Sequence, residues 1–383
     1  MSDSFSETTT VGWGSRLMDS IKGVFFGLIL AGISVAVLFW NEGRAVHRQQ
    51  ALEEGASSVV AVSADKVDPA NESKLIHVSG EAKSAEGLAD DQFDIKAPGA
   101  LRLNRTVEMY QWEQKEHTES KKNVGGSEER TTTYTYETVW SSREINSSSF
   151  KKIGHNNPGS IPYGGSSKNA TDATLAAFKL NDLILDSLSP NKTLVPAEAT
   201  KPAVDGKQKP AYTVSNGMLY LGNASSPKIG DVRIAFKELP PGPISIVARQ
   251  IKDTFETYKA KTGDVLLVQS GLVSADAMFK QAEDENKMIT WIIRAAGFVF
   301  IVIGFSMLFG PFVTLADVIP FIGSIISVGT FIGAFVCAIP VWLITVGIAW
   351  LYYRPVLGIA LIAGAIAVPI LFKMMRSPKP ATA

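Results

Sequence analysis

Long apolar runs stand at both ends of the chain, and about 250 mostly polar residues separate them. One run covers residues 24–40. The other covers 291–372, where Arg294, Asp317 and Arg354 are the only charged residues. About 20 residues of apolar helix cross the ~30 Å hydrocarbon core of a bilayer. The pattern predicts a membrane protein in which membrane anchors hold a large water-facing domain at both of its ends.

The N-terminal run is interpreted as a retained span rather than a cleaved signal peptide. Arg16 and Lys22 precede it, as in the charged start of a signal peptide. Its 17 apolar residues, however, exceed most signal-peptide cores, and it ends in Phe39-Trp40, an aromatic pair typical of a membrane interface. We therefore expect a first transmembrane helix that begins near residue 21.

The C-terminal block is harder to divide. Residues 318–353 form 36 positions without charge, about 54 Å as one helix, which is too long for one crossing and too short for two with a turn. We expect Pro320 and Gly323 to break off a partial or interfacial segment. The expected order is a polar tail (1–20), a first span (21–40), the polar domain (41–290) with helical stalks (42–60 and 274–290), a membrane block (291–373) with spans near 292–309, 329–352 and 356–372 and the partial segment 318–328, and a second polar tail (374–383).

Charge predicts the orientation and excludes one class of partner. Four spans place both termini on one side, and Lys373, Arg376 and Lys379 in the tail indicate that this side is cytoplasmic. The large domain is then periplasmic or lumenal. It holds 30 basic and 33 acidic residues, so it lacks the basic surface that a nucleic-acid partner requires. The only cysteine, Cys337, lies in an apolar span.

Between the anchors the pattern predicts mostly β-structure, and hence an α+β fold. Residues 131–140 are rich in β-branched and aromatic residues and are expected to pair with 106–114. Asn216-Gly217 between two strand-like arms predicts a tight hairpin. Leu175, Phe178 and Leu185 favour a helix over 172–188, and Ser274 is expected to begin the helix that leads into the last membrane block. Further expected strands are 74–79, 232–238, 244–250 and 265–269.

A series of short segments resembles the transmembrane protein 43 family, also called LUMA. The match runs in order from about residue 20 to 375, and its specificity comes from the order rather than from any one motif. The segments are Phe39-Trp-Asn-Glu-Gly-Arg-Ala45, Val107-Glu-Met-Tyr-Gln-Trp112, Trp140-Ser-Ser with Ile145-Asn146, Gly154-His-Asn-Asn-Pro158, Gly230-Asp231, Val247-Ala-Arg-Gln250, Lys261-Thr-Gly-Asp264, Arg294-Ala-Ala-Gly297 and Tyr353-Arg-Pro355.

The resemblance implies one N-terminal span, a large lumenal domain and a C-terminal multi-span block. In animals the family lies in the endoplasmic reticulum and inner nuclear membrane, where emerin and lamins are its partners in organising the nuclear envelope. This chain lacks the longer polar N-terminus of the animal members. We therefore expect a bacterial member in the inner membrane, without nuclear partners.

The polar domain offers one loop with candidate chemistry. Four histidines lie far apart without a ligand spacing, so neither a metal nor a cofactor is expected. The first interpretation of the loop 154–158 is a turn in which Asn side chains form hydrogen bonds with the backbone. The alternative is a binding site made by His155, Asn156, Asn157 and Trp112. Two patterns of penicillin-binding enzymes are matched, by Ser148-x-x-Lys151 and by Lys261-Thr-Gly263. We attribute these matches to chance, because the third element of those enzymes, Ser-Asp-Asn, is missing.

The membrane block offers glycines and isolated charges. Gly23 with Gly27, and Gly329 with Gly333, have the four-residue spacing that allows helices to approach closely. Arg294 and Asp317 are expected near span ends, where long side chains reach water.

Three functional classes follow from these features. The favoured one is a non-enzymatic membrane scaffold or organiser that forms homo-oligomers and presents its β-rich domain to protein or lipid partners. A membrane-bound enzyme would need His155 in a cleft beside a carboxylate with a shifted pKa. A transporter or channel would need ionisable groups at mid-bilayer depth, and none is found there.

Overall fold

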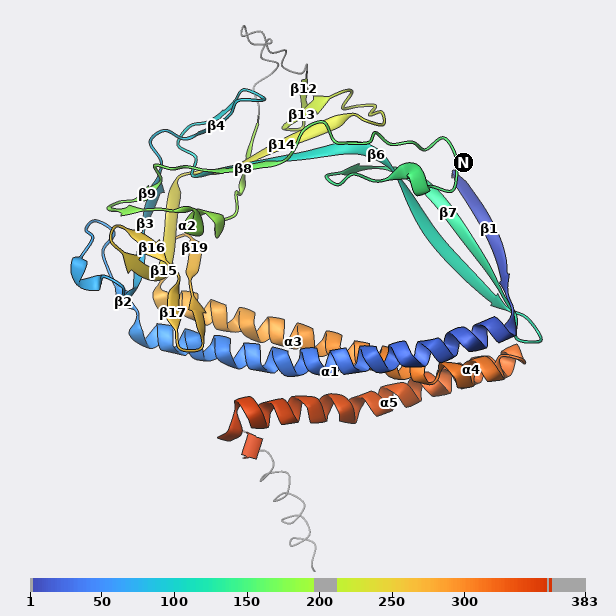
Figure 1. The fold of residues 1–383 in the computed structure, drawn as a ribbon. Helices are drawn as coiled ribbons and strands as arrows, with labels where there is room; N and C mark the ends of the chain where they lie inside the picture. Colours follow the sequence, from blue (N-terminus) through green and yellow to red (C-terminus); the bar gives the residue numbers. More distant parts are fainter. Residues whose placement is uncertain (1–2, 196–211, 357, 360–383) are drawn as a thin grey trace, which may run out of the picture. The chain divides into compact units, whose positions relative to one another are not determined.

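A computed structural model describes residues 3–195, 212–356 and 358–359, and the chain divides into two compact units (Figure 1). The β-rich unit consists of Met1–Thr8, Leu52–Glu119 and Thr131–Ala282. The helical unit consists of Thr9–Ala51, Ser120–Arg130 and Glu283–Ala383. The chain passes between the units five times, so each unit is assembled from distant parts of the sequence.

The described elements confirm the predicted α+β class, with one apolar helix before the β-rich region and two after it. The helices are α1 (Trp13–Ser58), α2 (Asp182–Asp186), α3 (Ala275–Leu308), α4 (Gly310–Ala316) and α5 (Pro320–Tyr353). The strands are β1 (Ser4–Val11), β2 (Val60–Ala61), β3 (Leu75–Lys83), β4 (Leu88–Asp90), β5 (Ile95–Ala97), β6 (Arg102–Lys122), β7 (Glu128–Ser141), β8 (Ser166–Asn169), β9 (Thr174–Leu175), β10 (Phe178–Lys179), β11 (Lys192–Leu194), β12 (Thr213–Ser215), β13 (Met218–Leu221), β14 (Val232–Leu239), β15 (Gly242–Ile251), β16 (Thr254–Glu256), β17 (Tyr258–Ala260), β18 (Gly263–Val265) and β19 (Leu267–Ser270).

The first sheet has eight strands, with the path β1-β7-β6-β14-β13-β12 and with β8 beside β6 and β11 beside β14. Alternate residues of β14, namely Val232, Ile234 and Phe236, are buried, as expected for a sheet with one face on the core. The predicted turn at Asn216-Gly217 joins β12 to β13. Both of its residues have positive φ, 50° and 76°, which is the backbone that a type I′ hairpin requires.

The second sheet has seven strands, with the path β10-β9-β3-β15-β16 and with β19 beside β15 and β2 beside β3. Its centre is β15, where five consecutive residues, 244–248, are buried. Four of these five residues are apolar, and a continuous buried run of this kind is typical of a strand covered on both faces. Phe178 and Phe255 stack in this core with ring centroids 5.3 Å apart.

The helix predicted over 172–188 is wrong. Leu175 and Phe178 are instead direct cross-strand partners of the hairpin β9–β10, and Ala176 at its turn has φ 49°. A two-residue turn brings residues i and i+3 to the same face, which is also the spacing of a helix. The helical part is limited to α2, where the Asn181 side chain accepts a bond from the Ile184 N–H.

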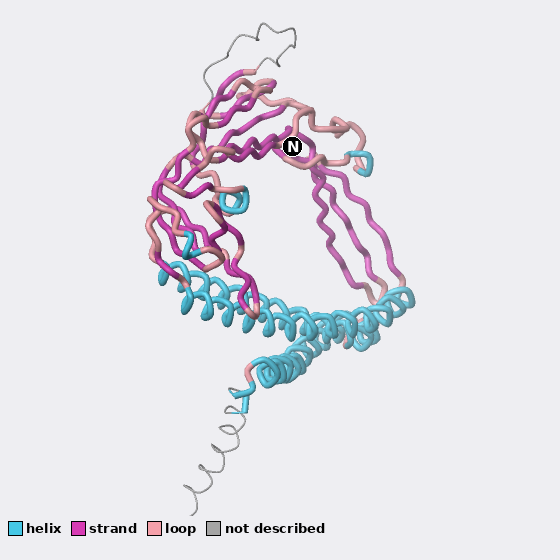
Figure 2. Tube along the Cα trace, turned by 60° about the vertical axis from the view of Figure 1, so that its left-hand side comes forward, coloured by secondary structure: helices cyan, strands magenta, loops and turns pink. Residues whose placement is uncertain are grey.

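The helical unit is built on α1, α3 and α5. Helices α1 and α3 run side by side (Figures 1 and 2), and Leu38, Ile301 and Ala338 from the three helices are fully buried together. All three helices are long and apolar enough to cross a membrane. The fourth predicted span, 356–372, lies outside the described residues except for its first few.

Two boundaries of this unit differ from the expectation. Helix α5 runs unbroken from Pro320 to Tyr353, so 318–328 is not a separate segment. Pro320 occupies the first helical turn, where a missing N–H breaks no bond. The expected polar tail 1–20 is also structured, because its residues 4–11 form β1 and α1 begins at Trp13. Strand β1 is fixed by its distant partner β7, which no local pattern reveals.

Candidate functional site

The predicted binding loop lies in the β-rich unit, against strands β6 and β7. The ring of His155 stacks on Tyr136 with a centroid distance of 4.1 Å and meets the edge of Trp112 at 4.6 Å. His155 is 5% exposed. The structure therefore brings His155 and Trp112 together, as the binding-site hypothesis requires. The two rings, however, form part of a closed aromatic stack.

Asp3, which directly precedes β1, closes this stack on the side of the His155 ring nitrogen. His155 Nε2 lies 2.6 Å from Asp3 Oδ2, and the same carboxylate forms an ion pair with Lys152. The hydrogen bond from Lys152, followed by that from His155, holds the pKa of Asp3 below its ordinary value. The three groups thus tie the start of the chain to the loop that follows β7.

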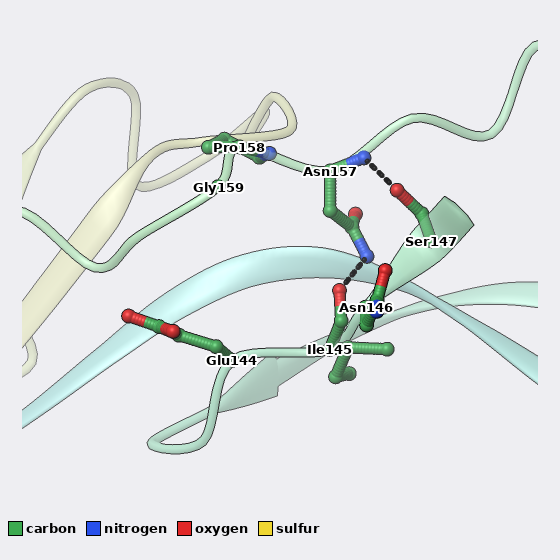
Figure 3. A pocket seen from close by; sticks show the side chains of 7 residues that line it. All are labelled: Glu144, Ile145, Asn146, Ser147, Asn157, Pro158 and Gly159. Atoms are coloured by element: carbon green, nitrogen blue, oxygen red, sulfur yellow. Dashed lines mark hydrogen bonds between the residues drawn. The ribbon is translucent and has the colours of Figure 1, made fainter. Parts of the chain in front are cut away.

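Asn157 uses its whole side-chain amide to extend the edge of β6. Its Oδ1 accepts the Trp112 N–H at 2.7 Å, while its Nδ2 donates to the Trp112 carbonyl at 2.9 Å. Nδ2 also donates to the Ile145 carbonyl at 3.1 Å, and the Asn157 N–H donates to Ser147 Oγ at 2.9 Å (Figure 3). Asn156, in contrast, is exposed on the loop. The loop therefore has the backbone-bonding role of the first interpretation.

An open cavity of about 370 Å³ lies beside Asn157 (Figure 3). The polar groups on its wall are engaged locally: Glu144 Oε1 accepts the Ile161 N–H at 3.1 Å, and Asn146 Oδ1 accepts the Ser148 N–H at 2.9 Å. His155 is not part of the wall. The pairing of His155 with a carboxylate, which the enzyme alternative requires, is thus present but lies outside the cleft. The cavity is lined by Glu144, Ile145, Asn146, Ser147, Asn157, Pro158 and Gly159.

Replacing Asn157 with alanine is expected to destabilise the β-rich unit by about 1–3 kcal/mol, because the bonded backbone groups of Trp112 and Ile145 lose their partner. Denaturant unfolding of the detergent-solubilised chain, followed by tryptophan fluorescence, measures the change. Asn156→Ala is the matched control at the exposed neighbouring position, with an expected change within about 0.5 kcal/mol. Equal effects of the two variants would contradict the role of Asn157.

Asp3→Asn is expected to make the N-terminal strand more mobile at neutral pH. A carboxyl whose folded pKa lies below the unfolded one stabilises the fold above the unfolded value, here about 3.8, and loses this effect as the pH falls through the folded value. The difference between the two proteins should therefore vanish in acid. Fluorescence anisotropy of a dye on Ser4→Cys, in a Cys337→Ala background, reports it. A difference in anisotropy that does not change with pH would show that ionisation of Asp3 does not hold the strand.

The predicted packing glycines have different surroundings in the helical unit. A Cβ on Gly27 would lie 2.5 Å from the Gly304 carbonyl oxygen, so α1 and α3 touch backbone to backbone at this point. At Gly23 and Gly333 the nearest atom is 3.9 Å away, and at Gly329 nothing lies within 4 Å. Gly27 therefore packs within the chain. Its partner Gly304 was missed, although Gly297 and Gly304 repeat at one-heptad spacing.

A buried ion pair, not foreseen from sequence, joins α1, α3 and α5. Arg294 Nε lies 2.6 Å from Glu42 Oε1, and its Nη2 lies 2.7 Å from Oε2. The Trp350 indole N–H donates to the same carboxylate at 2.9 Å, and the Trp291 ring lies 4.8 Å from the guanidinium. Glu42 is 2% exposed. The expectation that Arg294 reaches water is therefore wrong.

A second buried charge cluster surrounds Asp317, between α4 and α5. Its carboxylate accepts from Arg16 at 2.5 Å and from Lys122 at 2.8 Å. Arg16 also binds Glu128 at 2.8 Å and the Gly126 carbonyl at 2.6 Å. Asp317 is fully buried, so the expectation that it reaches water is wrong as well. Sequence showed each charge but not its partner, because the partners lie up to 301 residues apart.

These features define an integral membrane protein whose β-rich region is inserted between apolar helices. The family model described as Transmembrane protein 43 matches residues 109–355. The mouse and human proteins named Transmembrane protein 43 are each 32% identical to this chain over 96% of its length and 93% of theirs. A Drosophila melanogaster homolog is 27% identical over 94% of this chain and 95% of its own. The chain therefore belongs to the transmembrane protein 43 family. No solved structure matches it.

Proposed function

We propose that this protein is a non-enzymatic membrane scaffold that self-associates through its apolar helices and presents its β-rich unit to protein or lipid partners. The internal contacts of the candidate chemical groups support the non-enzymatic part of this proposal. His155, Asn157, Glu42, Arg294 and Asp317 are all engaged in internal contacts. Contacts of this kind support a structural role for these groups.

The exposed surface of α5 carries the self-association part of the proposal. In the most apolar stretch of α5, 22% of the residues are buried within the chain. The remaining apolar side chains must be covered by lipid or by another protein surface. Gly329 lies on this helix with open space beside it, and small residues at helix surfaces allow close packing in membranes. We infer that a second copy packs here.

The partners proposed are thus the lipid bilayer, a second copy of the chain and a ligand of the β-rich unit. The proposed location is a bacterial inner membrane, with the endoplasmic reticulum or inner nuclear membrane as its eukaryotic counterpart. The positions of the charges disfavour a transporter. Between Asp317 and Arg354, where α5 lies, the chain has no charged residue, and a polar path across a membrane needs such groups near mid-depth.

The test of self-association is the mass of the full chain extracted from its membrane in lipid discs, with and without cross-linking. A dimer or larger assembly is expected, and Gly329→Leu should shift it toward monomer because the larger side chain separates the helices. Ile325→Leu is the matched control, since it changes an exposed apolar residue of α5 at constant volume. A monomer in native lipid would overturn the proposal.

A further inference from the structure

On both sides of α1's apolar part the chain leads into the β-rich unit, which includes residues up to Thr8 before it and residues from Leu52 after it. On the N-terminal side, Asp3 contacts His155 and Lys152, and the Tyr136 N–H donates to the Asp3 carbonyl at 3.1 Å. On the C-terminal side, the chain returns to the same unit at Leu52. The apolar residues 24–40 thus lie between two attachments to one folded body.

The pairing of β1 with β7 is supported along its length. The hydroxyls of Ser6 and Thr133 lie 3.0 Å apart, and those of Thr8 and Thr131 lie 3.2 Å apart. Phe5 stacks on Tyr134 with ring centroids 6.1 Å apart. The N-terminal residues are therefore an integral edge strand of the sheet.

The tip of the β6–β7 hairpin binds the same end of α1 from within the helical unit. Gly126 accepts from Arg16 through its carbonyl and leaves room for the Trp13 ring, which a Cβ would meet at 2.3 Å. The Gly125 N–H donates to the Val318 carbonyl at 3.0 Å. The hairpin tip is thus held at the N-terminal end of α1, and it must lie on the same side of the membrane as that end.

Neither β1 nor the β6–β7 hairpin can pass through lipid. Residues 113–130, which include the hairpin tip, contain ten ionisable side chains, and β1 is an exposed edge strand. Open sheet edges do not occur in contact with the hydrocarbon core, because their free N–H and C=O groups find no partner there. A charged side chain at the bilayer centre adds a further cost of about 2.5–3.5 kcal/mol or more.

We infer that residues 3–11, the hairpin tip and the β-rich unit share one side of the membrane, so that α1 does not carry the chain from one aqueous side to the other. Because α1 is continuous from Trp13 to Ser58, it cannot turn back inside the bilayer. It then lies along the membrane with its apolar part in lipid. This replaces the expected orientation, in which the N-terminus is cytoplasmic and the large domain is periplasmic or lumenal.

Single cysteines in a Cys337→Ala background test the sidedness, since Cys337 is the only natural cysteine. Ser6→Cys lies in β1, and Ser160→Cys lies in an exposed loop of the β-rich unit. Sealed vesicles of known orientation are treated with a membrane-impermeant maleimide. Labelling of both cysteines from the same side is expected. Labelling from opposite sides would overturn the inference and leave the proposed self-association untouched.

A disulfide tests the strand pairing on which the inference rests. Ser6→Cys with Thr133→Cys should cross-link in the membrane, visible as a mobility shift lost on reduction. Ser6→Cys with Thr213→Cys is the matched control, because Thr213 lies on β12 at the other end of the sheet path. Failure of the first pair to cross-link would remove the β1–β7 pairing and overturn the inference.

Discussion

Replacing Arg294 with methionine is expected to destabilise the helical unit by about 3–5 kcal/mol, the usual cost of removing one partner of a buried ion pair. The variant leaves the Glu42 carboxylate buried, with the Trp350 indole N–H as its remaining donor among the bonds described above. Methionine keeps most of the volume of the side chain between Trp291 and Trp350, so the loss is electrostatic. The midpoint of unfolding in detergent, or the monodisperse fraction after heating, measures it.

Two controls separate this effect from a general loss of charge. Glu42→Gln combined with Arg294→Met removes both charges and should recover part of the stability, because no unpaired ion remains. Glu283→Gln breaks a surface contact with Lys287, where the groups are 3.9 Å apart and well exposed. Such pairs contribute about 0–1 kcal/mol. An Arg294→Met protein as stable as Glu283→Gln would show that the buried pair is not stabilising.

The elements predicted well are those whose information is local. Asn216-Gly217 requires no distant contact to form its turn, and residues 131–140 of β7 are rich in β-branched and aromatic residues. The apolar runs of α1, α3 and α5 follow from composition alone. Family membership was also predicted from short segments in order, and the comparisons confirm it.

The elements predicted wrongly depend on partners far away in sequence. Leu175 and Phe178 have a helical spacing, but they form the hairpin β9–β10, in which β9 pairs with β3 at the edge of the second sheet. Seven of the eight residues of β1 are exposed, and the strand forms because β7 offers a free edge. Sequence also showed Glu42, Arg294 and Asp317 individually. Their pairing depends on the register between helices, which a single sequence does not contain.

Replacing Gly27 with alanine is expected to destabilise the helical unit by about 1–3 kcal/mol, the range for overpacked sites. The new Cβ would lie 2.5 Å from the Gly304 carbonyl oxygen and 2.8 Å from Leu308 Cδ1. The first atom belongs to a helix backbone and cannot rotate away, so α1 and α3 must separate. Loss of the shared contact of Leu38 with Ile301 should follow. Thermal unfolding in detergent measures the change.

Gly32→Ala is the matched control on the same helix. Nothing lies within 4 Å of a Cβ at Gly32, so the substitution meets no obstacle and gains up to about 1 kcal/mol of helix propensity. The two variants make the same chemical change in α1 with opposite expected signs. Because Gly27 packs within the chain, its variant should lose stability at every protein concentration, whereas a contact between copies would make the loss depend on concentration. If the loss of stability depends on protein concentration, Gly27 lies at an interface between copies instead of packing within the chain.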